Sequence, residues 1–290
     1  RPGAVMALAP LALSRDIVGA TAGPIAHDID ARWLMAYAAG LGETDARYYD
    51  TLADSGPSAH PLFPACYEWP AMLGVRAVAT SDEIAIRSVH ATHDLTVHRP
   101  VRAGETLRTT ARVTGLVHRR AGTLLTVRNE TVDALGRPVT TTDYGSVYRD
   151  VGFEGGDAGV KPAGGTFDMP SGATGLPVAV PAWLAHVYSE CARIWNPIHT
   201  DVAVARAAGL PGVILHGTAT LALAVSHVMR HANIDPREVR RVRASFTGMV
   251  PLPSRLTVRV IEATEGNAFL FDVRGEDGAP VLSRGALHLV

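Results

Sequence analysis

The strongest constraint on the fold is an internal repeat of β-type sequence. Four stretches between residues 88 and 149 are rich in β-branched residues and are separated by Gly or Pro turns: SVHATHDLTVHRP, ETLRTTARVTGLVHR, GTLLTVRNETVDA and RPVTTTDYGSVYR. Four stretches of the same character follow from residue 239: VRRVRASFTGMV, SRLTVRVIEA, AFLFDVRGED and PVLSRGALHLV. Both sets predict antiparallel strands. The turn GRPV at 136–139 also matches GAPV at 278–281, so we interpret the two regions as an internal duplication.

Helical sequence precedes the strands in both halves. Asp30 fits an N-cap, and glycines follow the first helix at its other end. Helices followed by antiparallel strands indicate α+β units rather than βαβ units. The expected helices cover residues 30–42, 65–79, about 181–193, about 201–208 and about 217–232.

A segment saturated with Gly and Pro separates the two halves. It reads GFEGGDAGVKPAGGTFDMPSGATGLPV and contains few large side chains, which is typical of a linker. We therefore expect a first unit at 1–151, a linker at 152–178 and a second unit at 179–290.

Composition excludes several classes of function. The 290 residues are 47% hydrophobic, enough for one large domain or two ordinary ones. Lys plus Arg is 27 and Asp plus Glu is 28, which argues against a nucleic-acid or polybasic membrane surface. No apolar run is long enough to span a membrane. The two cysteines, Cys66 and Cys191, form no zinc pattern and fit a reducing compartment. We expect a cytoplasmic protein whose first few residues are a processing remnant.

The stretch RIWNPIHTD at 193–201 is the best candidate for a functional loop. Pro197 fixes the turn, and His199 is the residue type that changes charge near neutral pH. Asn196 can satisfy the turn backbone or orient a substrate carbonyl. The alternative is a polar loop that caps the next helix. The long helix and the duplicated strands downstream favour the functional interpretation.

Gly217 opens the long apolar helix in the second half. A glycine there lets a ligand approach free backbone N–H groups, where the helix dipole favours negative charge. Close packing of the helix against the sheet is the alternative. We interpret the preceding His216 as a hydrogen-bonded structural residue rather than a second base.

The order of helix, NPxH loop, long helix beginning with HG, and antiparallel strands resembles the hot-dog fold of MaoC-like dehydratases and (R)-specific enoyl-CoA hydratases. Two such units resemble the double hot-dog members, in which each antiparallel sheet wraps around a central helix. The likeness covers nearly the whole chain and is strongest from Tyr188 to about Val228. The first half resembles the degenerate, substrate-accommodating unit. It has the phrase VHRPVRAGETL but no second NPxH.

The family signature is Asp, any residue, Asn, Pro, any residue, His. Asn196, Pro197 and His199 match it, whereas the Asp position holds Ile194. In the family, Asp and His hold one water and pass its proton across the double bond of an acyl thioester. The resemblance also implies that the backbone N–H of Gly217 polarises the thioester carbonyl.

A carboxylate elsewhere would have to replace the missing aspartate. Glu190 is the first choice because it lies four residues before Ile194 and would share its face on a continuing helix. Asp201 is the second choice because it follows His199 closely. The alternatives are a solvated helix residue for Glu190 and a helix cap for Asp201.

Further side chains are candidates for substrate contact. Arg243, within RRVRASF, could meet the phosphates of coenzyme A or lie on a solvated strand. Tyr67 belongs to an aromatic group that could wall an acyl tunnel or form core. Ile194 and His216 flank the NPxH loop and the HG helix and are placed in the same substrate site. Three further histidines, His90, His93 and His98, lie close together in the sequence. We interpret them as strand residues rather than metal ligands.

The resemblance implies reversible hydration or dehydration of an enoyl-/3-hydroxyacyl-CoA thioester. His199, Glu190, Asn196 and Gly217 would be the catalytic group. No metal or cofactor is expected, with coenzyme A entering as part of the substrate. The alternatives are an acyl-CoA thioesterase, or a non-catalytic acyl-CoA-binding or partner subunit that lacks the motif aspartate. Nucleic acid and membranes are not expected partners, whereas a homo-oligomer of whole chains is left open.

Overall fold

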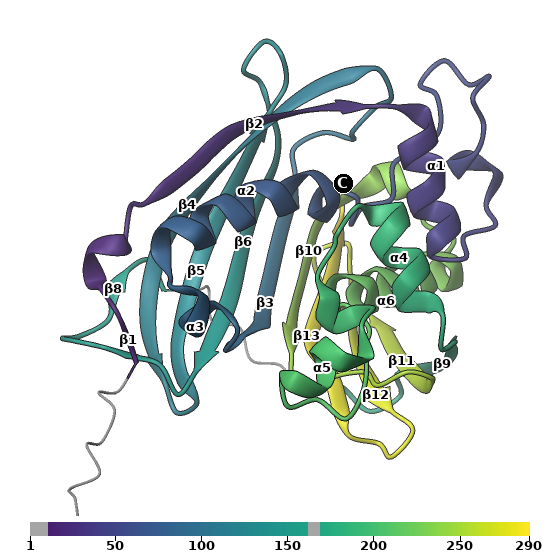
Figure 1. The fold of residues 1–290 in the computed structure, drawn as a ribbon. Coiled ribbons are helices and arrows are strands. Elements are labelled where there is room, and N and C mark those ends of the chain that lie inside the picture. The colour runs from purple at the N-terminus through teal and green to yellow at the C-terminus, as the bar shows by residue number, and fades with distance from the viewer. Residues whose placement is uncertain (1–10, 162–168) are drawn as a thin grey trace, which may run out of the picture.

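One long antiparallel sheet runs through both halves of the molecule. A computed structural model describes residues 11–161 and 169–290. Within these residues the sheet has 11 strands in the order β2-β4-β5-β6-β3-β10-β13-β12-β11-β9, with β8 paired to β4 (Figure 1). Few helices accompany this sheet, and they follow the α+β plan predicted from the sequence.

The first half begins with a short parallel pair and an edge strand that the sequence patterns did not reveal. Asp30 caps the first long helix, as predicted, because its carboxylate accepts the Trp33 N–H at 2.7 Å. The predicted helices and the four predicted strands are all present. The elements are β1 (Ala12–Leu13), η1 (Arg15–Ile17), β2 (Thr21–Ile29), α1 (Ala31–Gly40), η2 (Ala46–Tyr48), α2 (Pro64–Ala79), α3 (Asp82–Ala85), β3 (Ser88–Val97), β4 (Glu105–Arg119), β5 (Gly122–Val132) and β6 (Pro138–Arg149).

The predicted linker contains strands. β7 (Gly152–Phe153) pairs with β1, β8 (Ala158–Gly159) pairs with β4, and β9 (Thr174–Val180) pairs with β11. β9 includes a proline, which an edge strand tolerates, and this proline hid the strand from pattern analysis. The second half therefore begins inside the expected linker, whose residues 162–168 lie outside the described residues, as do residues 1–10.

The second half repeats the plan of the first. Its predicted helices and strands are also present, with ends shifted by a few residues. The elements are α4 (Leu184–Ala192), η3 (Pro197–His199), α5 (Val202–Ala207), α6 (Gly217–Ala232), η4 (Pro236–Glu238), β10 (Val239–Phe246), β11 (Ser254–Glu262), β12 (Ala268–Gly275) and β13 (Pro280–Leu289).

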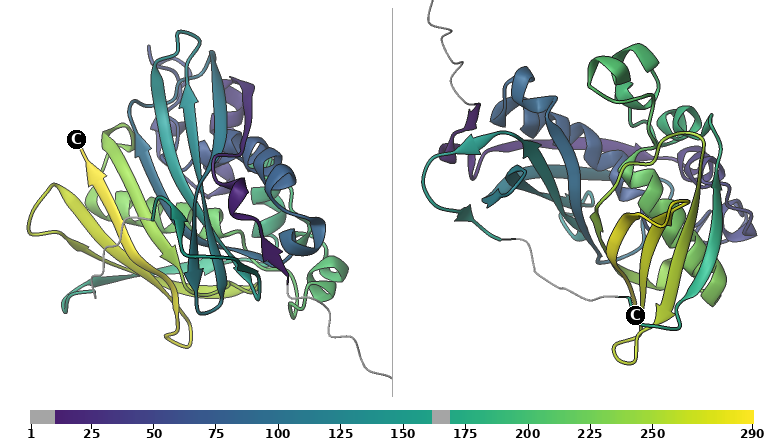
Figure 2. Two further views of the ribbon diagram at one scale, coloured as in Figure 1. Left: turned by 90° about the vertical axis from the view of Figure 1, so that its left-hand side faces the viewer. Right: turned by 90° about the horizontal axis from the view of Figure 1, so that it is seen from below.

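The strand order supports the predicted duplication. From the centre outward, β3-β6-β5-β4-β2 in one half corresponds to β10-β13-β12-β11-β9 in the other. β3 and β10 pair directly and join the two half-sheets. The sheet curves around α2 in the first half and around α6 in the second (Figure 2). The matched turns use the same backbone geometry, since Gly136 and Gly278 both have φ 77°, where glycine is favoured.

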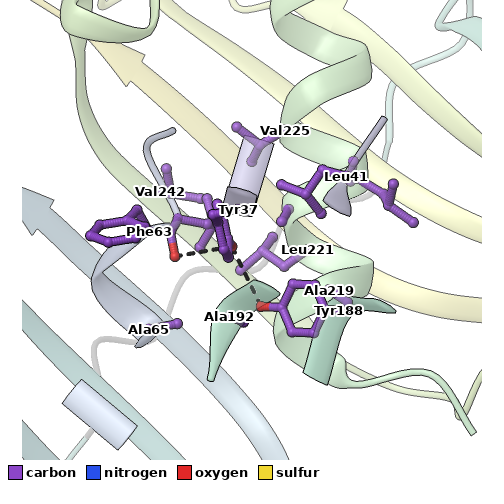
Figure 3. Packing of buried hydrophobic residues seen from close by; sticks show 14 of the residues in the cluster. Tyr37, Leu41, Phe63, Ala65, Tyr188, Ala192, Ala219, Leu221, Val225 and Val242 are labelled. Carbon is purple, nitrogen blue, oxygen red and sulfur yellow. Dashed lines mark hydrogen bonds between the residues drawn. The ribbon is translucent and has the colours of Figure 1, made fainter. Parts of the chain in front are cut away.

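The corresponding helices α1 and α4 of the two halves pack against each other. The hydroxyls of Tyr37 and Tyr188, 151 residues apart, lie 3.4 Å from each other (Figure 3). Gly40 packs against Cys191 so closely that a Cβ on Gly40 would lie 2.9 Å from the Cys191 Cβ. One buried apolar cluster extends across this contact and includes residues of both halves, so the halves share a core.

Both cysteines are free thiols, Cys66 buried and Cys191 partly exposed. None of the helices within the described residues is long and apolar enough to cross a membrane.

Candidate active site between the two halves

The NPxH loop begins where α4 ends abruptly. Arg193 adopts left-handed geometry, with φ 58° and ψ 35°, and the Ile194 N–H donates to the Ser189 carbonyl at 3.1 Å. This C-cap reverses the chain and buries Ile194. Pro197 then starts a 3₁₀ turn closed by the His199 N–H and the Asn196 carbonyl at 3.1 Å. The turn carries His199 into the interior.

His199 is held as a neutral base. Its Nδ1 lies 2.8 Å from the Ile214 carbonyl, so Nδ1 carries the proton and Nε2 keeps its lone pair. The carbonyl is itself fixed, because the Leu215 N–H donates to the Val250 carbonyl at 2.8 Å. Burial lowers the pKa of His199 to about 4, which leaves the imidazole unprotonated at neutral pH.

The imidazole ring of His216 packs against that of His199. The two imidazoles stack with centroids 3.8 Å apart, and His216 Nε2 lies 3.1 Å from the Ser189 hydroxyl oxygen. Burial, and next the neighbouring His199, keep the pKa of His216 well below its usual value. A neutral, hydrogen-bonded His216 suits the structural role expected from the sequence.

The start of α6 presents backbone donors beside these rings. The His216 side chain does not cap the helix, so the first N–H groups of α6 are left for another partner. A Cβ on Gly217 would lie 3.1 Å from the Phe246 ring and 3.2 Å from His90 Nδ1. Glycine is thus favoured by close packing, and it also lines the cavity described next. The packing interpretation of Gly217 is thus supported, and the role of its N–H toward a thioester stays a prediction.

A cavity of about 190 Å³ lies between the two halves. Asn196, His199 and Gly217 line it from the second half. The first half contributes one face of α2 and the inward side chains of β3, β5 and β6. The lining side chains of that half include Ala65, Glu68, Trp69, Met72, Leu73, Val75, Arg76, Ala79, His90, His93, Leu125, Val127, Tyr144 and Tyr148.

Neither predicted partner carboxylate reaches this cavity. Glu190 is exposed and accepts the indole N–H of exposed Trp195 at 3.2 Å. The prediction was wrong because α4 ends at Ala192, so the shared-face argument fails. Asp201 caps α5 and accepts the Ala203 N–H at 2.8 Å, which is its structural alternative.

Two of the predicted substrate contacts also lie elsewhere. Tyr67 is fully buried, and its hydroxyl lies 2.9 Å from the Thr140 hydroxyl, so it is a core residue. Arg243 is on β10, on the face opposite the buried Val242, and does not line the cavity. Ile194 and His216 do line it, and their contact with a substrate stays a prediction.

His90 and His93 lie on strand β3, as expected, and they face inward rather than toward solvent. His90 lies between the rings of Tyr144 and Phe246, at 3.8 and 4.0 Å, and both His90 and His93 line the cavity. His98 instead contacts the Thr141 hydroxyl at 2.9 Å. Within the described part of the chain, no group of three or more His, Cys, Asp or Glu could hold a metal ion.

Sequence reasoning missed Glu68. Its carboxyl lines the cavity from α2, is 3% exposed, and accepts the Thr142 hydroxyl at 2.7 Å. Burial raises the pKa of Glu68 to about 8. The available signal was a single acidic residue in the apolar helical stretch ACYEWPAML, since an isolated buried acid is unusual.

Two family models match the chain, one in each half. Residues 16–142 match the FAS1-like dehydratase domain region, and residues 188–274 match the MaoC like domain. A fatty acid synthase subunit beta from Aspergillus oryzae is 42% identical over 76 residues, which is 26% of this chain and 4% of that subunit. A protein named "probable enoyl-CoA hydratase 2" from Dictyostelium discoideum is 24% identical over 182 residues, 61% of each chain. The chain thus spans only part of these curated relatives.

Solved structures share the fold at low identity. A MaoC-like dehydratase from Phytophthora capsici superposes with TM-score 0.82 at 19% identity, covering 94% of this chain and 96% of that one. The peroxisomal multifunctional enzyme type 2 from Drosophila melanogaster gives 0.72 at 22% identity, covering 92% and 48%. Rv0216 from Mycobacterium tuberculosis, described as a double hot-dog fold, gives 0.61 at 16%, covering 93% and 95%. The chain thus combines a FAS1-like dehydratase region in its first half with a MaoC-like domain in its second, and it shares the double hot-dog fold of MaoC-like dehydratases of known structure.

Proposed function

We propose that the protein catalyses reversible hydration of an enoyl-CoA thioester to the 3-hydroxyacyl-CoA. One observation carries the proposal: a buried, neutral His199 and the uncapped start of α6 line the same cavity. The relatives named as enoyl-CoA hydratase 2 and fatty acid synthase point to the same substrate class.

The chemistry follows from the groups present. His199 Nε2 takes a proton from water as the water oxygen attacks the β-carbon. Negative charge then develops on the thioester oxygen, where the free N–H groups at Gly217 and Thr218 stabilise it. Asn196 positions the water or the carbonyl. The reaction moves a proton and a hydroxide, so no metal or redox cofactor is proposed, and coenzyme A is part of the substrate.

The site's location suggests how the acyl group is held. The thioester would lie at the second half, and the acyl chain would extend along the apolar face of α2 and against β5. The cavity of about 190 Å³ favours a short or medium acyl chain over a long one. A cytoplasmic location stays part of the proposal.

The test is turnover of trans-2-enoyl-CoA esters of graded length, followed by loss of the conjugated thioester absorbance. Wild type, His199→Ala and His231→Ala are compared, the last being an exposed histidine on the same helix as Gly217. We expect hydration by wild type and by His231→Ala, and a loss of about 10²–10⁴-fold in kcat with His199→Ala. Equal rates in all three proteins would contradict the proposal.

A non-catalytic acyl-CoA-binding role is the second candidate. It is favoured by the buried Ile194 at the motif's acid position and by the exposed place of Glu190. Binding of acyl-CoA esters without any turnover would establish it. Release of free coenzyme A thiol, measured in the same assay, would instead indicate the thioesterase.

A further inference from the structure

Hydration needs a proton at the α-carbon, and the motif residue that would help to deliver it is absent. Ile194 is 4% exposed and lines the cavity with a hydrocarbon side chain. Glu190 and Asp201 point away from the cavity. The second half therefore offers a base without an acid.

We infer that Glu68, from the first half, is the proton donor that works with His199, so that the site is completed across the two halves. This rests on the proposed hydration reaction. Among the described residues that line the cavity, Glu68 carries the only carboxyl group. It stands on α2, whereas His199 stands on the NPxH loop, and the same cavity separates them.

The local contacts of Glu68 suit a donor. The Thr142 hydroxyl on β6 donates to Glu68 Oε1 at 2.7 Å. Because Oε1 accepts this bond, the acidic proton is placed on Oε2, the other oxygen of the carboxyl. A side chain that is 3% exposed and tied to a strand has little freedom to swing into solvent.

The protonation state also fits. Burial raises the pKa of Glu68 to about 8, against a smaller opposing effect of the Thr142 hydrogen bond, so the carboxyl keeps its proton at neutral pH. The other titratable groups that line the cavity are Arg76, His90, His93, Tyr144, Tyr148, His199 and His216. The histidines with shifted values all have lowered pKa values, so they are neutral and cannot donate as acids.

The proton balance closes without a co-reactant. Water loses one proton to His199 Nε2, and its oxygen bonds the β-carbon. The electron pair of the double bond moves through the α-carbon to the thioester oxygen. The enolate then takes the proton from Glu68, forming the new C–H bond and restoring the carbonyl. His199 returns its proton to the Glu68 carboxylate through solvent, and one water has been added.

The experiment compares wild type with Glu68→Gln, which keeps an oxygen for Thr142 but removes the acidic proton. Glu83→Gln on exposed α3 is the matched control. We expect Glu68→Gln to lower kcat about 10²-fold with little change in KM. Wild-type kcat should fall above pH 8, and this alkaline limb should be missing from the residual activity of the variant.

A second experiment asks whether a carboxyl at position 194 can restore the activity that Glu68→Gln removes. Ile194→Asp in the Glu68→Gln background returns a carboxyl to the motif position and should recover kcat at least about tenfold, within the range of acid–base effects. Binding of the saturated CoA ester of the same chain length, measured by calorimetry, checks that each variant still folds and binds.

Several results would overturn the inference. They are a kcat for Glu68→Gln within about twofold of wild type, a rise in KM alone, a wild-type kcat that stays flat to pH 9.5, or no recovery in the double variant. The pH profile is measured on wild type alone. It therefore still tests the inference if Glu68→Gln does not fold. Absence of wild-type turnover on every ester would instead count against the proposed function itself.

Discussion

The two halves share one plan and diverge where their first helices end. η2 and η3 begin at residues 46 and 197, the same 151-residue separation that relates Tyr37 to Tyr188. By this correspondence Tyr48 occupies the place of His199, and Glu43 the place of Ile194. The first half has an acid in its loop without a base, and the second has a base without an acid. One frame can therefore support a reactive loop or a structural one, depending on a few side chains.

The side chains around the two loops also differ, with charged groups beside η2 and a larger cavity beside η3. Around η2, Arg47 pairs with Asp45 and reaches Asp235 of the other half at 3.2 Å. The hollow there is about 120 Å³, smaller than the 190 Å³ cavity beside η3. Tyr48 lies 6.1 Å from His60, whereas His199 lies 3.8 Å from His216. Ion pairs therefore fill the space beside η2, whereas largely apolar side chains surround a larger cavity beside η3.

The largest expected effect compares the two loop residues directly. His199→Ala should lower kcat by about 10²–10⁴-fold, since it removes the base. Tyr48→Phe, the matched change in the other loop, should leave kcat within about twofold, because Tyr48 lines the smaller hollow beside η2 and does not line the cavity of His199. Steady-state hydration kinetics measure both. A large loss with Tyr48→Phe would mean that the first-half loop takes part in catalysis.

The next largest effect is expected on the free energy of unfolding as the pH is lowered, through one buried histidine in each half. Burial lowers the pKa of His60 to about 3 and that of His199 to about 4. The unfolded chain binds these protons near pH 6.5, so the free energy of unfolding falls as pH drops below 6.5. The loss from His199 alone is about 3 kcal/mol by pH 4, and that from His60 continues to lower pH.

Urea unfolding at pH 7, 6, 5 and 4 measures this dependence. His199→Gln should make the fall between pH 6.5 and 4 smaller than in wild type by about 3 kcal/mol, while the share from His60 and the other buried histidines remains. A fall of the same size in wild type and in His199→Gln would contradict burial of a neutral His199.

A smaller effect is expected at the contact between α1 and α4. Tyr37 donates to the Leu62 carbonyl at 3.2 Å, and Tyr188 donates to the Thr218 hydroxyl at 3.1 Å. Each Tyr→Phe change should cost about 1 kcal/mol. Only Tyr188→Phe should also raise KM, because Thr218 lines the cavity. Equal kinetic effects of the two changes would argue that the contact is functionally symmetric.

The smallest effect is expected at the acid first predicted from the sequence. Glu190→Gln should leave kcat within about twofold, since its carboxylate contacts only exposed Trp195 among the side chains described. A tenfold or larger loss would return Glu190 to the site and weaken the case for Glu68.

The sequence was sufficient for elements with strong periodic patterns and insufficient for contacts between distant segments. The strands β3–β6 and β10–β13 and the helices α2 and α6 follow their patterns closely. β2 and β9 were missed because each is an edge strand that contains proline. Asn196, His199 and Gly217 were placed together because a motif brings them close in sequence. Glu68 and Thr142 are 74 residues apart, and no local pattern predicts their meeting.

Both half-sheets belong to one polypeptide, and β3 and β10 join them where two separate subunits could have met. In a symmetric dimer of identical chains every substitution appears twice, so a change that opens one pocket opens both. Here each substitution occurs once. The side chains around η2 can be chosen for rigidity while those around η3 are chosen for access, and neither choice constrains the other. Because the two halves are covalently connected in one chain, each half can acquire side chains for a different role while both keep the same architecture.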